Sequence, residues 1–232
     1  MLLKELREQV LDANLELVRR GLVLYTFGNA SGISRADGLI AIKPSGVPYE
    51  ELCPEHMVIT DLDGRIVDGT LRPSSDLDTH LELYKAFPKI GGVAHTHSEF
   101  ATAWAQARKP VPCFGTTHAD YFHGSVPVTE PMSAEAIEGD YEKNTGTAII
   151  NLFRDLDYER IPAVLVVNHG PFSWGPDPAA AAHNAVLLEH VARVAYRTIA
   201  INAEAGPIST DLHDKHFLRK HGSQAYYGQK KT

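Results

Sequence analysis

Three histidines stand at the ends of two apolar runs in this sequence. His95 and His97 close the run Ile90-Gly-Gly-Val-Ala-His-Thr-His, and His169 follows Ala163-Val-Leu-Val-Val-Asn. Side chains at positions i and i+2 of a β-strand project from the same face, so His95 and His97 could bind one ion together. A third imidazole from a second strand would leave one coordination position open for water or substrate, as in catalytic zinc sites. The spacing therefore predicts a metalloenzyme, although nine further histidines leave the third ligand open.

Three short segments rich in glycine and hydroxyl side chains could bind a phosphate. Gly28-Asn29-Ala30-Ser31-Gly32 and Lys43-Pro44-Ser45-Gly46 are each expected to follow a strand, and Pro73-Ser74-Ser75-Asp76 leads into a helix. Backbone N–H groups, hydroxyls, a lysine and a helix N-terminus all favour an anion. Each segment alone is more typical of a turn or a helix cap, because the chain has no Walker or dinucleotide motif. Only their convergence in space would create a site.

Two further segments carry groups suited to proton transfer. The segment Gly115-Thr-Thr-His-Ala-Asp-Tyr makes Asp120 a candidate general acid or base, although a solvated loop carboxylate is the simpler interpretation. Tyr226 and Tyr227 lie near the end of the chain, where packing or disorder is the usual outcome. A tyrosine there could also donate a proton if the tail reaches an active site.

The elements that must position these residues follow from hydrophobic periodicity and turn signals. Strands and helices alternate between residues 74 and 201, and tight turns join the earlier strands, with Asp63-Gly64 in one hairpin. The pattern predicts one three-layer α/β domain over residues 1–232, with a largely antiparallel or mixed sheet covered by helices on both faces. Strand order is not readable from it. We expect helices at 2–20, 77–87, 99–107, 133–153, 178–201 and 212–220, and strands at 22–27, 39–43, 57–61, 91–97 and 163–168.

The bulk composition excludes several classes of protein. Of 232 residues, 44% are hydrophobic and 22% charged, which is typical of a globular domain. A formal charge of −7 gives no general attraction to nucleic acid or to an anionic membrane. Two cysteines cannot form a disulfide framework. The chain carries neither an apolar signal core nor a stretch of about 20 apolar residues, so the cytoplasm is the expected location.

With these segments in view, the chain resembles the class II aldolase/epimerase family over essentially its whole length. The His-x-His motif marks the family as a whole. The Thr-Thr-His-Ala-Asp-Tyr segment and the Tyr-Tyr-Gly-Gln ending are more typical of the epimerases within it. The matching segments are Gly28-Asn29, Ile42-Lys-Pro-Ser-Gly46, residues 72–76, Gly91-Gly-Val-Ala-His-Thr-His-Ser98, residues 115–122, His169-Gly-Pro-Phe-Ser-Trp-Gly175, residues 214–222 and residues 225–229.

The resemblance implies a role for each of these residues. A divalent metal would be bound by His95, His97 and His169 with Asp76 beside it, zinc being expected and manganese or cobalt alternatives. Asp120 and Tyr227 match the acid/base pair, and Thr116 matches a residue near the reacting aldehyde. Tyr227 and His216 would come from a neighbouring subunit of a C4 homotetramer, with residues 221–232 forming the tail that reaches it. The substrate phosphate would be bound by Asn29, Lys43, Ser45, Gly46, Ser74 and Ser75.

The implied activity is the interconversion of L-ribulose 5-phosphate and D-xylulose 5-phosphate through retro-aldol cleavage and re-addition between C3 and C4. A phosphate-sugar aldolase of the fuculose-1-phosphate type is the nearest alternative, followed by a metal-dependent dehydratase. A non-catalytic domain like the adducin head belongs to a different class. Two departures from the family pattern stand out: Asn168 where serine is expected, and an extension at residues 230–232. An arabinose pathway and other pentose or ascorbate pathways all remain open.

Overall fold

The computed structural model describes residues 1–229, so the extension at residues 230–232 lies outside the described residues. One seven-stranded sheet forms its centre, in the order β4-β3-β2-β1-β5-β7-β6, and each neighbouring pair is antiparallel. This confirms the expected antiparallel α/β class. The strands are β1 (Asn29–Ser34), β2 (Leu39–Ile42), β3 (Val58–Asp61), β4 (Ile66–Asp68), β5 (Gly92–His95), β6 (Ala163–Val166) and β7 (Gly170–Gly175).

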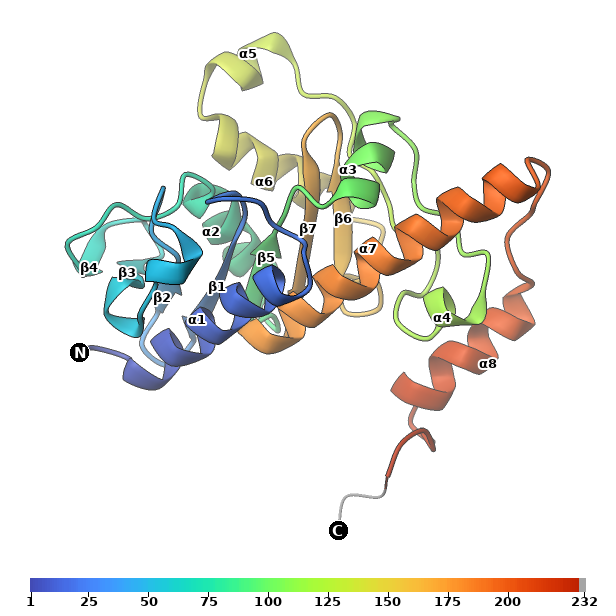
Figure 1. Cartoon of the computed structure of the whole chain (residues 1–232), viewed down its shortest axis with the longest axis horizontal. Coiled ribbons are helices and arrows are strands. Elements are labelled where there is room, and N and C mark those ends of the chain that lie inside the picture. Colours follow the sequence, from blue (N-terminus) through green and yellow to red (C-terminus); the bar gives the residue numbers. More distant parts are fainter. Residues whose placement is uncertain (230–232) are drawn as a thin grey trace.

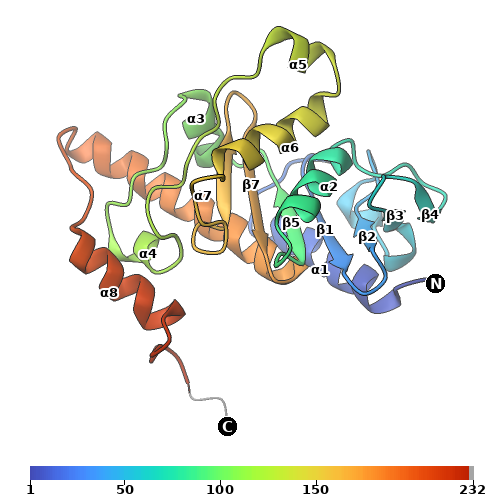
Figure 2. The same cartoon turned by 180° about the vertical axis from the view of Figure 1, so that it is seen from behind.

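Helices cover both faces of the sheet, as Figures 1 and 2 show from opposite sides. One face packs against α1 (Lys4–Arg19), α3 (Glu99–Gln106) and α7 (Pro178–Ile201), and the other against α2 (Leu77–Ala86) and α6 (Tyr141–Leu152). Successive side chains of β6 point alternately into the two hydrophobic cores on opposite faces of the sheet. Val164 and Val166 pack toward α2 and α6, whereas Leu165 packs toward α7.

The smaller elements lie at the margins of this three-layer body. Two 3-10 turns, η1 (Tyr49–Glu51) and η2 (Pro54–His56), connect β2 to β3, and α5 (Ala134–Glu138) precedes α6. The last helix, α8 (Thr210–His221), contacts the short α4 (Thr116–Ala119). Figure 1 shows this pair beside the C-terminal half of α7, at the opposite end of the molecule from β3 and β4. Within residues 1–229, no helix is both long and apolar enough to cross a membrane.

The two long helices begin and end where their sequences predict. Asp177 accepts a hydrogen bond from the backbone N–H of Ala180 at 2.7 Å, and Pro178 opens α7 at a position where a missing N–H costs nothing. At the other end of the sequence, α1 buries Val10 and Leu17 against the sheet. Gly21 then takes a φ of +68°, the left-handed conformation that commonly ends helices.

Three expectations about the elements are wrong. Residues 22–27 form no strand, and the first strand starts at Asn29, inside the segment that we expected to be a loop. A strand could not run straight into β1, because Gly28 has a φ of +73° and a side chain there would lie 2.8 Å from the carbonyl oxygen of His95. The helix expected at 133–153 is divided into α5 and α6 around Gly139, and α4 lies where we expected neither a helix nor a strand.

A second strand that the sequence did not reveal is β7, whose residues Gly-Pro-Phe-Ser-Trp-Gly show no alternation of polarity. Both of its faces are buried, so no alternation is needed. β7 pairs with β5 in the register that sets Phe172 opposite His95, and β6 pairs with its other edge. The turn between β6 and β7 therefore returns the chain to the end of β5. This return brings the third histidine to the first two.

Candidate functional site

The three predicted histidines meet at one end of the sheet. His95 is the last residue of β5, His97 follows two residues later, and His169 lies in the turn between β6 and β7. Their ring centroids form a nearly equilateral triangle with sides of 4.9, 4.7 and 5.1 Å. One ligand nitrogen from each ring lies within 4.8 Å of the other two. The structure therefore brings together the complete imidazole set that the sequence suggested.

The hydrogen bond at Nδ1 of His95 leaves its Nε2 available to a metal. Nδ1 of His95 lies 2.9 Å from the carbonyl oxygen of Pro171, which can only accept, so Nδ1 carries the proton. Nε2 then presents a lone pair, 3.0 Å from Nε2 of His97. Two nitrogens bound to one tetrahedral zinc ion are roughly 3.3 Å apart, close to this spacing. A carbonyl that orients an imidazole in this way is typical of metal-binding histidines.

The other two imidazoles are held in the neutral form that binds metals. Burial, reinforced by the neighbouring His95, lowers the pKa of His169 to about 4. The same two causes lower the pKa of His97. Neutral rings at physiological pH can offer lone pairs without first losing a proton.

The turn that carries His169 needs an unusual backbone conformation. Asn168 has a φ of +59°, and asparagine adopts this left-handed region more readily than most residues. Next to it, a side chain on Gly170 would lie 2.7 Å from the carbonyl oxygen of Thr96. Asn168 thus suits its position physically, although serine was expected there. The hydroxyl of Tyr141 lies 3.4 Å from Nδ1 of His169.

Asp76 faces the histidines instead of capping its own helix. It occupies the N-cap position of α2, yet its carboxylate makes no capping hydrogen bond. Its Oδ2 instead accepts a hydrogen bond of 2.7 Å from Asn29 and lies 4.0 Å from Nε2 of His95. Burial raises the pKa of this carboxyl, but the neighbouring His95 and the hydrogen bond from Asn29 act against burial, and the pKa lies below its usual value. Asp76 is therefore an anion beside the imidazoles.

The predicted phosphate residues line the same cavity, which has a volume of about 380 Å³. Lys43 is its main positive group. The lysine is 1% exposed, and its Nζ lies 3.3 Å from the carbonyl oxygen of Thr26, with no acidic partner among the described residues. Burial lowers the pKa of Lys43 to about 8. The other predicted residues in the wall are Asn29, Ser45, Gly46, Ser74 and Ser75, together with Asp76 and the three histidines.

One buried polar atom in this wall has no hydrogen-bond partner among the described residues. Asn29 donates through Nδ2 to Ser74 Oγ at 2.9 Å and to Asp76, whereas its Oδ1 is buried without a hydrogen bond. Buried amide oxygens nearly always accept a hydrogen bond in folded proteins. An acceptor at this position suits a ligand that carries hydroxyl groups.

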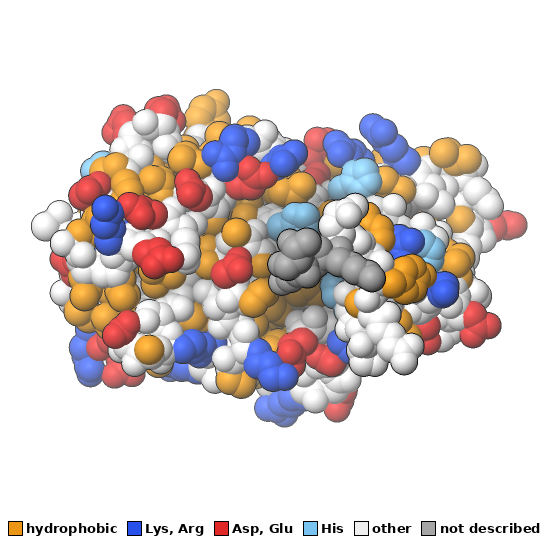
Figure 3. All heavy atoms as spheres, turned by 90° about the horizontal axis from the view of Figure 1, so that it is seen from below, with side chains coloured by type: hydrophobic (Ala, Val, Ile, Leu, Met, Phe, Trp, Pro, Cys, Tyr) orange, Lys and Arg blue, Asp and Glu red, His pale blue; other side chains and the backbone are white. Residues whose placement is uncertain are grey.

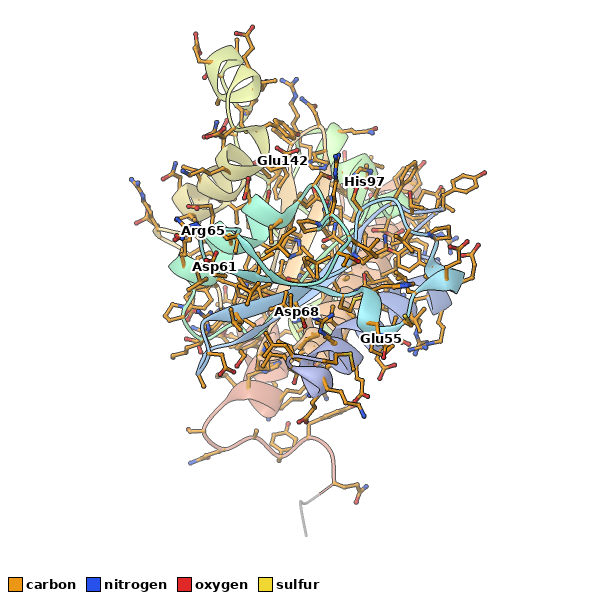
Figure 4. All side chains as sticks on the ribbon, turned by 90° about the vertical axis from the view of Figure 1, so that its left-hand side faces the viewer. Glu55, Asp61, Arg65, Asp68, His97 and Glu142 are labelled. Atoms are coloured by element: carbon orange, nitrogen blue, oxygen red, sulfur yellow. The ribbon has the colours of Figure 1, made fainter. Side chains whose placement is uncertain are left out.

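Several residues in the wall were not expected from the sequence. Tyr141 and Glu142 come from the first turn of α6, and Phe27 comes from the loop before β1. Figure 4 shows Glu142 and His97 in the upper part of the view, away from Glu55 and Asp68 below. The sequence held no signal for them, because a tyrosine and a glutamate at a helix start are ordinary surface residues.

Asp120 lies in a separate cluster between α4 and α8. The guanidinium of Arg219 donates to both carboxylate oxygens, at 3.0 and 2.7 Å, and Nδ1 of His216 lies 3.1 Å from Oδ1. Nζ of Lys220 lies 3.8 Å from Oδ2. Burial raises the pKa of Asp120, but the bonds from Arg219 and His216 and the charge of Lys220 hold it below the usual range. Thr116 starts the same short helix.

Tyr227 belongs to this cluster and faces outward. Its ring lies 5.0 Å from the guanidinium carbon of Arg219 and 4.3 Å from Nζ of Lys220, and 60% of the residue is exposed. Figure 3 shows hydrophobic side chains beside basic ones on the face that carries the C-terminal tail. Within the described residues, no side chain of α4 or α8 lines the histidine cavity. One chain thus brings the predicted residues together in two groups that do not meet.

A second group of possible metal ligands, His123, His213 and Asp214, already makes hydrogen bonds within the protein. His123 Nε2 lies 2.8 Å from Asp214 Oδ1, and His213 Nε2 lies 3.1 Å from the backbone nitrogen of Gly124. These hydrogen bonds fasten the loop after α4 to α8. They stabilise the Asp120 cluster and leave its geometry dependent on both segments.

Comparison with known proteins identifies relatives at two levels. The class II aldolase and adducin N-terminal domain model matches residues 8–196. The L-ribulose-5-phosphate 4-epimerase UlaF of Salmonella paratyphi B is 52% identical over 228 residues, which cover 98% of this chain and 100% of that protein. The protein of the same name from Salmonella typhi is also 52% identical, with the same coverage.

Solved structures match the fold at lower identity. An L-fuculose 1-phosphate aldolase has a TM-score of 0.79 at 24% identity, covering 94% of this chain and 96% of that one. The L-fuculose-1-phosphate aldolase of Thermus thermophilus has a TM-score of 0.69 at 23% identity, covering 89% and 100%. At these identities the structures establish a shared fold.

Proposed function

Because this chain belongs to the class II aldolase and adducin N-terminal domain family, we propose that it is a metal-dependent epimerase acting on L-ribulose 5-phosphate. Its product would be D-xylulose 5-phosphate. The relatives that share 52% of its residues over nearly the whole chain carry the name of this activity. The observation that carries the proposal is the cavity itself, with three imidazoles and a carboxylate at one side and a buried lysine among hydroxyl groups at the other.

The imidazole side of the cavity suits a divalent ion. His95, His97 and His169 would bind it with Asp76 beside them, and zinc is our first expectation because neutral imidazoles are among its preferred ligands. Manganese and cobalt remain alternatives, since the same ligands suit several first-row metals. When bound, the ion supplies Lewis acidity that stabilises negative charge on substrate oxygens.

The lysine side of the cavity would hold the phosphate throughout the reaction. C4 of the substrate is not adjacent to the ketone, so its inversion needs cleavage of the C3–C4 bond. Cleavage gives two fragments: the enediolate of dihydroxyacetone, and glycolaldehyde phosphate. The aldehyde group of glycolaldehyde phosphate must rotate before the bond re-forms. Lys43, Ser45 and Ser74 would retain the aldehyde fragment by its phosphate during this rotation. The unpaired Oδ1 of Asn29 would accept a hydrogen bond from a substrate hydroxyl.

Inversion also requires proton exchange with the C4 oxygen from both faces, which needs two acid/base groups. We assign these roles to Asp120 and Tyr227, with Thr116 near the aldehyde. Hydrogen bonds and ring contacts tie Asp120, His216, Arg219 and Tyr227 into one cluster, apart from the cavity of their own chain. The cluster would therefore enter a neighbouring chain's cavity as a unit. In a homotetramer with fourfold cyclic symmetry, each subunit would place its cluster in the cavity of the next subunit, with residues 221–229 completing the contact.

A coupled assay tests the proposed reaction. The protein is incubated with L-ribulose 5-phosphate, with and without a chelator, and xylulose 5-phosphate is measured. We expect xylulose 5-phosphate to form, and the chelator to abolish its formation. Release of glycolaldehyde phosphate instead would favour a fuculose-1-phosphate type of aldolase. Inactivity together with the absence of bound metal would favour a non-catalytic, adducin-like domain.

Subunit complementation tests the sharing of residues between chains. His97→Asn would lose the metal, and Tyr227→Phe would lose proton transfer, so each variant alone should have little activity. When the two are unfolded and reassembled together in equal amounts, about a quarter of the sites in a cyclic oligomer combine His97 from one chain with Tyr227 from the next. Recovery of about that fraction of wild-type activity supports shared sites. Absence of recovery, with mixed oligomers present, would contradict them.

The proposed reactants are those of sugar metabolism, and we expect the protein in the cytoplasm. Arabinose catabolism is one route that would use it, and other pentose or ascorbate routes would present the same substrate.

A further inference from the structure

A buried histidine behind the imidazole triangle has one ring nitrogen without a partner. His80 lies on α2, one turn after Asp76, and its side chain is fully enclosed. Its Nδ1 lies 2.6 Å from Ser31 Oγ, whereas its Nε2 makes no hydrogen bond among the described residues. Buried polar atoms without partners are rare in folded proteins, so this nitrogen requires an explanation.

The hydrogen bonds of Ser31 decide which nitrogen of His80 carries the proton. Ser31 Oγ also lies 2.8 Å from the buried hydroxyl of Tyr84. If Tyr84 donates to Ser31 and Ser31 donates to Nδ1 of His80, both hydroxyl protons have acceptors. The reverse order would leave the Tyr84 proton buried without an acceptor, which is unfavourable. His80 is therefore protonated on Nε2, and the group without a partner is an N–H donor.

Asp76 offers the complementary acceptor. The backbone N–H of His80 donates to the carbonyl oxygen of Asp76 at 3.2 Å, and the two side chains are close enough for each to influence the pKa of the other. Asn29 occupies Oδ2 of Asp76, and Oδ1 makes no hydrogen bond in the described part of the chain. Burial lowers the pKa of His80 to about 3 against the opposing effect of Asp76, so the ring stays neutral.

We propose that His80 is a positioning residue whose Nε2–H donates to the Asp76 carboxylate and holds it toward the imidazole triangle when a divalent ion binds there. This inference rests on the proposed function, because it assigns Asp76 to that site. The unpartnered donor and the free carboxylate oxygen then satisfy each other, and the Tyr84–Ser31 pair keeps the proton on the correct nitrogen. Hydrogen bonds of this kind orient the groups around catalytic metals.

The tautomer can be tested without any activity measurement. Nitrogen-15 NMR of the metal-free protein distinguishes imidazoles protonated on Nε2 from those protonated on Nδ1, and the His80→Gln variant assigns the signal. We expect His80 on Nε2, with its N–H resonance moving downfield when Zn²⁺ is added. A ring protonated on Nδ1 would overturn the proposal, and so would an N–H resonance that zinc leaves unchanged.

Two substitutions separate positioning from packing. His80→Gln can place an amide donor near the Nε2 position, whereas His80→Asn is too short to reach it. We expect His80→Asn to weaken the affinity for Zn²⁺ alone roughly 10- to 100-fold, and His80→Gln to stay within about threefold of wild type. Thr60→Val is the matched control, because it alters another buried unpaired polar atom in β3, outside the cavity wall.

The outcomes are distinguishable from those of the proposed function. Zinc affinity and epimerase activity of the wild-type chain report on that function, and a wild-type chain without zinc affinity would overturn both proposals. If the wild type binds zinc, equal losses in His80→Asn and His80→Gln would show a packing role and overturn this inference alone. Wild-type affinity in His80→Asn would do the same. Melting temperatures of the metal-free variants establish that all are folded.

Discussion

The cavity around the histidines and the cluster around Asp120 are built in opposite ways. The first lies among strand ends of the central sheet, with His95 and Lys43 each 1% exposed. The second lies where two helices meet beyond the sheet, and its tyrosine is largely exposed. Cations surround Asp120, whereas the cavity holds a lysine without an acidic partner within residues 1–229. The cavity thus suits a ligand, whereas we propose that the cluster meets the cavity of a neighbouring chain.

In the proposed function, ligand binding and proton transfer would therefore depend on different parts of the fold. Sheet hydrogen bonds and two apolar cores hold the cavity residues, so a single chain suffices to assemble them. Ion pairs and hydrogen bonds between α4 and α8 hold the cluster. A substitution in one region should therefore leave unchanged the property measured for the other region, such as zinc content for the cavity or the pKa of Asp120 for the cluster.

The largest effect is expected from Tyr227→Phe. Loss of the phenolic proton should lower turnover by roughly 10²- to 10⁴-fold, the usual contribution of general acid–base catalysis. Zinc content, measured by elemental analysis, should not change, because Tyr227 lies outside the cavity. The neighbouring Tyr226→Phe serves as the control, since Tyr226 is 64% exposed. Full activity of Tyr227→Phe would remove this residue from the mechanism.

A smaller effect is expected from Lys43→Met. A hydrogen bond to a charged group contributes about 1.5–3 kcal/mol, so KM should rise roughly 10- to 100-fold. The wild-type KM should also rise as pH increases through about 8, because the ammonium form is lost above this pKa and the phosphate then loses its cation. Steady-state kinetics against pH should show no such rise in the variant. Lys85→Met, whose lysine pairs with Glu82 on the surface, is the control.

Arg219→Gln should have a moderate effect that concerns the second region alone. Removal of the guanidinium takes away hydrogen bonds that hold the pKa of Asp120 low, so this pKa should rise. Asp120 then becomes protonated at a higher pH than in the wild type. The acid limb of the pH–rate profile should therefore shift to higher pH. Lys215→Gln, which contacts the ring of Tyr226, should leave the limb in place. An unmoved limb in Arg219→Gln would show that Asp120 does not control it.

The smallest effect is expected from Asn168→Ser in the turn before His169. Serine adopts a positive φ less readily than asparagine, so the free energy of unfolding should fall by about 1 kcal/mol or less. Urea denaturation of the metal-free protein measures this change. Asn168→Gly should be tolerated better at the same φ. A loss of several kcal/mol in Asn168→Ser would mean that the side chain has a role beyond its backbone conformation.

The sequence predicted most elements of the fold, because helices such as α1 and α7 carry long periodic patterns and clear end signals. It failed where burial removes periodicity, as in β7, and where close packing imposes small residues, as in β1. A side chain on Gly32 would lie 2.6 Å from Pro178, so this glycine reflects helix packing and not a loop. Tyr141 and Glu142 could not be predicted as cavity residues, because only the packing of α6 against α2 brings them there.

By itself, the sequence determined the chemical inventory: imidazoles at strand ends, hydroxyl-rich turns, a lysine, an acid and a late tyrosine. Short motifs fix residue types and local spacing, and these are properties of neighbouring positions. Only the tertiary structure decided that the inventory forms two groups, because the order of strands and the position of α8 depend on contacts between distant residues. It also decided that His80, an ordinary helix residue in the sequence, is fully buried behind the imidazole triangle, with one ring nitrogen that has no hydrogen-bond partner among the described residues.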